Sequence, residues 1–99
     1  MISISYGGPE EMFPVNYQRR QCNEFMKLGL QGVSVVVASG DSGVAGLDGC
    51  MGPDEKIFSP EFPATCPYLT TLGATYLPPG GIAAKNQEVA AGFSGGGFR

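Results

Sequence analysis

A strand–helix–strand pattern near the start of the chain constrains its fold more than any other feature. The run Val33–Ala38 is almost continuously β-branched, as in a parallel strand that is covered on both faces. Residues 16–30 place apolar side chains at helical spacing, with Asn16 as the expected N-cap and Gly32 as the glycine that ends the helix. Ile2–Tyr6 alternates apolar and small polar residues. This pattern predicts two parallel strands joined by a right-handed helical crossover.

The two strand ends, at Gly7 and Ser39, should therefore lie at the same edge of the sheet, where open α/β sheets bind ligands. Residues 39–67 are rich in glycine and proline and too long for a simple connection, which indicates a functional or disulfide-tied loop. Residues 68–75 are expected to form a third strand, and residues 89–93 a short edge strand.

Composition excludes several classes of function. The chain has 99 residues, of which 42% are apolar and 15% charged, so it should be globular with one domain at most. A net charge of −3 without a basic cluster argues against binding to nucleic acid or to an anionic membrane. The longest apolar run, Val35–Ala38, is far too short to span a bilayer, and the first residues do not resemble a signal peptide.

Metal chemistry is also disfavoured, because the chain has no histidine and no C-x-x-C pair. Its three cysteines fit an oxidising compartment with one disulfide. We expect this bond between Cys50 and Cys66, since both lie in the long loop and closing about 15 residues is worth roughly 3 kcal/mol in the chain-entropy model. Cys22 is then a free cysteine packed on the apolar helix face. The alternative is that both loop cysteines are reduced.

Ser39-Gly40-Asp41-Ser42-Gly43 follows the buried strand directly and allows three interpretations. Gly-Asp-Ser-Gly is similar to the nucleophile segment of chymotrypsin-like proteases, but that chemistry needs a histidine base and an antiparallel barrel. A nucleophile elbow requires G-x-S-x-G, which is not matched. The third interpretation is a glycine-rich turn in which Asp41 only caps backbone amides.

Five segments in a fixed order raise this motif above a simple turn, and together they span nearly the whole chain. The set closely resembles the sedolisin branch of the subtilisin fold, especially its fungal tripeptidyl-peptidase members. The matching segments are Ser3–Gly8, Val35–Gly43, Phe58–Ala64, Leu72–Thr75 and Ser94–Phe98. The resemblance implies an α/β fold, a partial subtilisin-like doubly wound parallel sheet, with residues 1–99 as an internal fragment of a sedolisin catalytic domain.

The resemblance also implies roles for individual residues. Asp41 matches the aspartate of the family's oxyanion hole, and Ser5, Tyr6 and Gly7 match the strand along which this fold lays its peptide substrate. The family's catalytic glutamate and aspartate lie upstream of the first matching segment, and its serine and calcium site lie downstream of the last. The fragment is therefore expected to lack the catalytic Glu, Asp and Ser, and to bind no metal or cofactor.

We accordingly expect the parent protein to be a secreted serine-type peptidase that hydrolyses peptide bonds at acid pH, as an endopeptidase or a tripeptidyl-peptidase. Its partner is a peptide or protein substrate. Asp41 can donate a hydrogen bond to an oxyanion only when it is protonated, and burial at the strand edge should favour that form. The resemblance further suggests a cis bond at Ser59–Pro60. The alternative is a truncated-gene product with no catalytic function.

Overall fold

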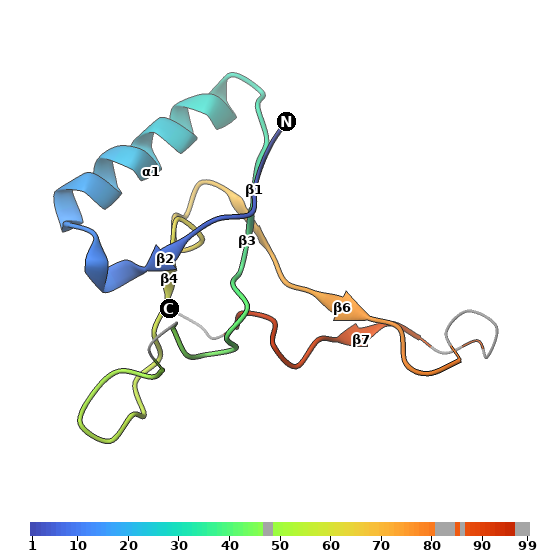
Figure 1. Cartoon of the computed structure of the whole chain (residues 1–99). Helices are drawn as coiled ribbons and strands as arrows, with labels where there is room; N and C mark the ends of the chain where they lie inside the picture. Colours follow the sequence, from blue (N-terminus) through green and yellow to red (C-terminus); the bar gives the residue numbers. More distant parts are fainter. Residues whose placement is uncertain (47–48, 81–84, 86, 97–99) are drawn as a thin grey trace.

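The central feature of the fold is a parallel sheet in the order β1-β3-β5, seen in a computed structural model that describes residues 1–46, 49–80, 85 and 87–96 (Figure 1). A single α-helix joins β1 to β3. The elements, in chain order, are β1 (Ile2–Ile4), β2 (Gly8–Pro9), the 3₁₀ turn η1 (Glu10–Met12), α1 (Val15–Leu30), β3 (Val35–Ala38), β4 (Glu61–Phe62), β5 (Thr70–Leu72), β6 (Thr75–Tyr76) and β7 (Val89–Ala90).

β3 is the central strand, and it pairs in parallel with a neighbour on each side. Its Val35 and Val37 side chains are buried, as the β-branched run predicted. The parallel strand–helix–strand unit is therefore confirmed. Among the described residues only one helix packs beside this sheet, so the doubly wound, subtilisin-like arrangement stays a prediction.

The N-terminus of α1 differs from the prediction. The helix begins at Val15, and its N-cap is Pro14 rather than Asn16. Proline suits a helix start because its backbone is pre-set near φ −65° and it has no N–H to satisfy. The Gln18 side chain strengthens this end, because its Nε2 donates hydrogen bonds to the Glu10 carbonyl at 2.9 Å and the Phe13 carbonyl at 2.8 Å.

The C-terminus of α1 is as predicted. Gly32 has a φ of +82°, in the left-handed region that glycine adopts without strain. Its N–H donates to the Gly29 carbonyl and the Val33 N–H donates to the Leu28 carbonyl, both at 3.0 Å. These two bonds form a Schellman motif, which satisfies carbonyls at the helix end and turns the chain into β3.

The exposed side of α1 carries a small charged cluster. Glu24 accepts hydrogen bonds from Lys27 at 2.9 Å and from Arg20 at 3.1 Å. These bonds, that of Lys27 foremost, lower the pKa of the Glu24 carboxyl. The opposite face of the helix is only half-buried, and Leu30, expected on the packed face, is 82% exposed.

A second, antiparallel ladder joins β2 to β4, pairing Gly8 with Phe62 and Pro9 with Glu61. The Phe62 ring is buried and lies 5.0 Å from the ring of Phe13 and 6.1 Å from that of Tyr17. Aromatic pairs at these separations are worth about 0.5–1.5 kcal/mol beyond the area they bury. This cluster attaches β4 to the start of α1.

The disulfide joins Cys22 of α1 to Cys66, and Cys50 is a free cysteine. The prediction of a Cys50–Cys66 bond is therefore wrong. The reason lies in the loop that carries Cys50: the bridges Gly46–Gly49 and Met51–Ile57, on either side of Cys50, fold this loop on itself, and it projects away from the sheet (Figure 1). Cys22 is close to Cys66 because α1 packs beside the segment that follows β4.

The cis peptide bond also lies elsewhere than predicted. It joins Phe62 to Pro63, not Ser59 to Pro60. Cis proline is typical of tight turns, and here the chain turns immediately after β4. In that turn the Thr65 N–H donates to the Glu61 carbonyl at 3.1 Å.

The predicted third strand is shorter than residues 68–75, because it is interrupted after Leu72 and resumes as β6. β6 pairs antiparallel with β7, which confirms a short strand at Val89 and places it in a projecting hairpin (Figure 1). Gly97 and Phe98, which belong to the matching segment Ser94–Phe98, lie outside the described residues.

The chain has more surface than a compact protein of its mass. Its accessible surface is 7033 Å², against roughly 5,400 Å² for a monomer of 10.3 kDa. Its radius of gyration is 15.7 Å, against about 13 Å for a compact domain of 100 residues. Several large apolar side chains are exposed, including Ile2 and Leu72 at the two outer strands of the sheet.

Peptide mapping tests the disulfide directly, because trypsin places each cysteine in a different peptide. Cys22 falls in 21–27, Cys50 in 28–56 and Cys66 in 57–85. Without reduction, we expect a cross-linked species of 21–27 with 57–85, and alkylation of Cys50 alone. A cross-link between 28–56 and 57–85, found by mass spectrometry, would contradict the structure.

Candidate functional site

The predicted site residues gather around a hollow of about 230 Å³ at the carboxyl ends of β1 and β3. Because the two strands are parallel, the segments that follow them emerge on the same edge of the sheet. The residues that line the hollow are Ser5, Tyr6, Gly7, Ala38, Gly40, Asp41, Ser42 and Glu61. The convergence expected from the strand–helix–strand pattern is thus present.

Ser5, Tyr6 and Gly7 form one wall of this hollow. They lie between β1 and β2, outside the ladders of both strands, and all three are exposed. Tyr6 is 84% exposed and is not part of the core. A backbone segment in this state is available to a peptide that adds itself as a further strand.

Asp41 also lines the hollow, three residues after the end of β3. Asp41 is exposed in this chain. The burial expected for it in the parent protein stays a prediction. The glycine-rich turn around it explains the exposure: Gly40 and Gly43 have φ values of +103° and +62°, and the turn leads the chain away from the sheet.

Two glycines permit the close approach of β4 to both of these segments. A Cβ on Gly7 would lie 2.8 Å from the Phe62 carbonyl oxygen, and a Cβ on Gly40 would lie 2.8 Å from the carboxyl carbon of Glu61. Real Cβ atoms essentially never make such short contacts. Glycine is therefore needed at both positions if Glu61 is to reach the hollow.

The segment Ser94–Gly96 supports the Asp41 turn from outside. The Gly95 N–H donates to the Gly40 carbonyl at 2.8 Å, and the Gly96 N–H donates to the Gly43 carbonyl at 3.1 Å. Ser94 Oγ accepts a hydrogen bond from the Ala74 N–H at 2.9 Å. Gly95 and Gly96 therefore hold the turn by backbone hydrogen bonds, and the Ser94 side chain ties their segment to Ala74.

No family model matches the chain. Among curated proteins, it is 62% identical to tripeptidyl-peptidase sed1 of Aspergillus fumigatus over 106 residues, covering 99% of this chain and 16% of that protein. It is 47% identical to aorsin of Aspergillus oryzae, over 99% of this chain and 17% of that protein. It is also 48% identical to tripeptidyl-peptidase SED1 of Arthroderma otae, over 91% of this chain and 15% of that protein.

This chain is a homologue of sedolisin-family peptidases. The resemblance drawn from its motifs is thereby confirmed, and it extends over nearly the whole chain. The chain spans about one sixth of the length of the curated relatives it matches. The roles of Asp41 and of Ser5–Gly7 are not tested by these comparisons and stay predictions.

Glu61 is the residue of the sedolisin-like site that sequence reasoning missed. It lies within the matching segment Phe58–Ala64, but no local signal showed that its side chain reaches the hollow. The signal that was available is the pair of glycines, Gly7 and Gly40, which marks places where another part of the chain approaches closely.

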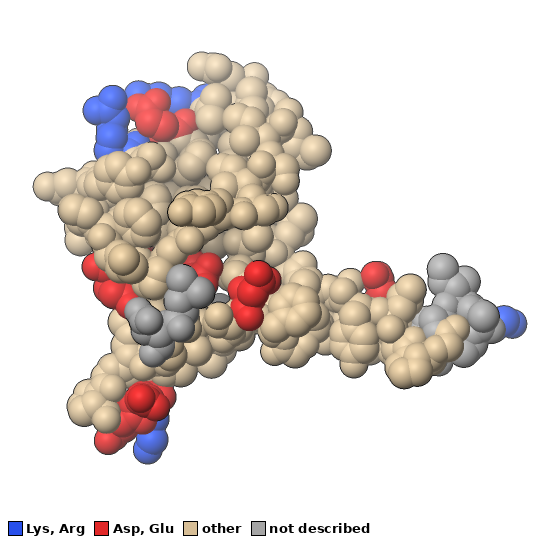
Figure 2. Space-filling view, viewed as in Figure 1, with Lys and Arg blue, Asp and Glu red and all other residues tan. Residues whose placement is uncertain are grey.

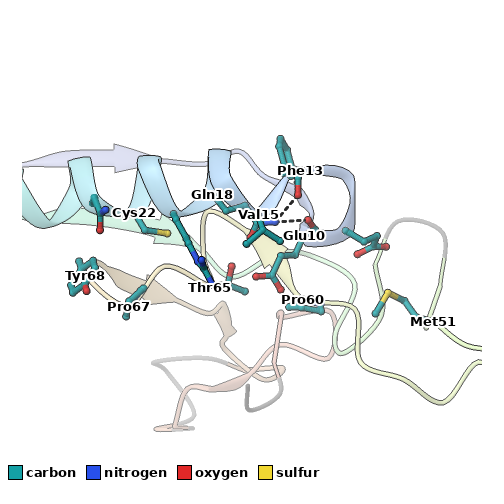
Figure 3. A pocket seen from close by; sticks show the side chains of 13 residues that line it. Glu10, Phe13, Val15, Gln18, Cys22, Met51, Pro60, Thr65, Pro67 and Tyr68 are labelled. Carbon is teal, nitrogen blue, oxygen red and sulfur yellow. Dashed lines mark hydrogen bonds between the residues drawn. The ribbon is translucent and has the colours of Figure 1, made fainter.

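A larger hollow, of about 600 Å³, lies between α1 and the segment around Thr65 (Figure 3). Cys22 of the disulfide borders it, and the two hydrogen bonds of Gln18 cross one end. None of the predicted site residues lines it. Its size alone therefore gives it no part in the predicted chemistry.

Two further features are missing from the part of the chain that the structure describes. The described residues contain no group of three or more His, Cys, Asp or Glu side chains placed to hold a metal ion. The helix that they form is not both long and apolar enough to cross a bilayer.

Replacing Gly95 tests the support of the Asp41 turn. In Gly95→Ala the new methyl group would overlap the Ser39 carbonyl, so we expect a loss of about 1–3 kcal/mol in the free energy of unfolding. Gly29→Ala is the matched control, because nothing lies within 4 Å of its Cβ and alanine favours a helix by up to about 1 kcal/mol. Urea unfolding followed by circular dichroism measures both. Equal midpoints for the two variants would show that Gly95 has no such role.

Proposed function

We propose that this chain is the part of a sedolisin-type catalytic domain that binds the peptide substrate and stabilises the oxyanion during peptide-bond hydrolysis. The observation that carries the proposal is the hollow at the ends of β1 and β3, which both Asp41 and the exposed segment Ser5–Gly7 line. Its homology to proteins named as tripeptidyl-peptidases supports the reaction class.

In this proposal the substrate adds itself as a strand beside Ser5–Gly7, and backbone hydrogen bonds hold its scissile carbonyl near Asp41. When a nucleophile attacks that carbonyl, negative charge develops on its oxygen. A protonated carboxyl at Asp41 donates a hydrogen bond to this oxyanion, which an ionised carboxylate cannot do. The proposed peptidase therefore works at acid pH, either as an endopeptidase or as a tripeptidyl-peptidase.

The nucleophile and its base come from other parts of the proposed catalytic domain. Ser42 lines the hollow but has no histidine in the chain to act as its base, and Ser94 is engaged by the Ala74 N–H. The extended shape and large surface of the chain support its being one part of a larger fold. We further propose that the whole protein is secreted, in keeping with its disulfide.

A chimeric peptidase tests the role of Asp41. In it, this chain replaces the 62%-identical segment of A. fumigatus tripeptidyl-peptidase sed1. We expect Asp41→Ala to lower kcat by about 10²- to 10³-fold, the usual loss for one oxyanion donor. Asparagine donates at every pH, so Asp41→Asn should retain more activity than alanine and lose less of it toward neutral pH. Full activity of the alanine variant would reduce Asp41 to a residue that caps the turn.

The isolated 99-residue chain provides the complementary prediction. It should hydrolyse no peptide at acid pH above the rate in buffer, because a binding strand and one oxyanion donor do not supply a nucleophile. Peptide hydrolysis is followed by mass spectrometry after stringent purification. Turnover that disappears in Ser42→Ala would show that Ser42 is a nucleophile and would overturn the role given to Asp41.

A further inference from the structure

The loop between β3 and β4 folds on itself and projects from the body of the chain (Figure 1). Two hydrogen bonds close it, since the Met51 N–H donates to the Ile57 carbonyl at 2.8 Å and the Ile57 N–H donates to the Met51 carbonyl at 3.0 Å. Beyond them, the Glu55 N–H donates to the Gly52 carbonyl at 3.1 Å. Residues 52–57 are all exposed. The end of the loop is therefore held by these three backbone hydrogen bonds rather than by burial.

Lys56 lies in this exposed end of the loop, whereas three other basic residues lie within α1. Those three are Arg19, Arg20 and Lys27. A peptidase binds the residues around the bond that it cuts in an extended conformation, so a helical segment must unwind first. α1 has 16 residues and is tied by the disulfide to the segment after β4. Opening residues 52–57 requires only the loss of three hydrogen bonds and therefore costs less free energy.

The end of the loop also carries a side chain that one class of endopeptidase recognises. In Figure 2, acidic and basic side chains lie together on the projecting loop at the lower left. The sequence there is Asp54-Glu55-Lys56-Ile57. Lys56 is exposed and forms no ion pair with a described residue. Endopeptidases of the trypsin type bind a basic side chain through a carboxylate in their own pocket, and the ammonium group of Lys56 is accessible to such a pocket.

We propose that the end of this loop is a cleavage site for a lysine-directed endopeptidase, which cuts between Lys56 and Ile57 and leaves a two-chain form that stays folded. The reaction consumes one water molecule and breaks the amide bond. It leaves a carboxyl group on Lys56 and an amino group on Ile57. This inference goes beyond the proposed function and does not depend on it.

The contacts that cross the cut explain why the two pieces should stay together. Cys22 belongs to the first piece and Cys66 to the second, so the disulfide links them covalently. The ladders of β2 with β4 and of β3 with β5 also join one piece to the other. Close to the cut, the Ser59 N–H donates to the Val44 carbonyl at 3.1 Å. The sheet and the hollow should therefore survive cleavage.

Lys85 is the other described lysine outside the helix, and a cut after it would give a different product. It is exposed and lies between β6 and β7. Both cysteines of the disulfide precede Lys85, so this bond would not link the following piece to the rest. Gel mobility with and without a reducing agent therefore distinguishes the two sites.

Brief digestion of the chimeric peptidase with lysyl endopeptidase tests the site. Mass spectrometry identifies the new amino termini within the grafted chain. We expect the terminus at Ile57 to appear at least about 10-fold faster than the one that follows Lys27, because the loop opens more readily than the helix. Lys56→Gln should abolish this cut, and Lys27→Gln, the matched control on the helix, should leave it unchanged. Lys56→Arg should resist lysyl endopeptidase but be cut by trypsin.

The product has two expected properties. On a denaturing gel, the pieces on either side of the cut should separate only after reduction, and the cut chimera should keep the circular dichroism spectrum of the uncut protein. Earlier cleavage after Lys27 or Lys85 would overturn the assignment of the site. Separation without reduction, or loss of the spectrum on cleavage, would overturn the folded two-chain form. These readouts need no peptidase activity, so an inactive chimera counts against the proposed function alone.

Discussion

The parallel pairing of β3 with both β1 and β5 is the interaction on which the rest of the structure depends. It buries Val35 and Val37, and these two residues make up much of the small core. Because the ladders are parallel, the segments after each strand leave the sheet at one edge. Ser5–Gly7 and Asp41 are more than thirty residues apart in sequence, and they share one hollow because of this pairing.

The position of β4 does not depend on the parallel sheet. β4 lies in the long loop between β3 and β5, and other contacts fix it. Three separate attachments fix it: the ladder with β2, the packing of Phe62 on aromatic rings of the helix start, and the Cys22–Cys66 disulfide. The disulfide closes a sequence separation of 44, for which the chain-entropy model gives roughly 4 kcal/mol. Reduction of the disulfide would remove one of these three attachments.

Local rules account for what could be predicted from the sequence. The β-branched run around Val35, the helical spacing before it and Gly32 each act over a few residues, so strand, helix and helix end were expected correctly. The disulfide, the cis bond at Pro63 and the approach of Glu61 all depend on how β4 returns to the sheet. Nothing in the neighbouring sequence encodes that return, and choosing Cys50 as a partner because it shares a loop with Cys66 gave a wrong bond.

Asp41 is exposed in this chain, although the proposed role as an oxyanion donor favours a site without water. An oxyanion donor is most effective where water is excluded, since hydrogen bonds to a developing charge are then stronger and need no reorganisation. Asp41 is exposed, and the sheet beside it leaves Ile2 and Leu72 uncovered at its two outer strands. The proposed function therefore requires further cover over this edge. A bound peptide strand along Ser5–Gly7 supplies part of it, and the relatives, about six times longer than the matched region, have ample chain to supply the remainder.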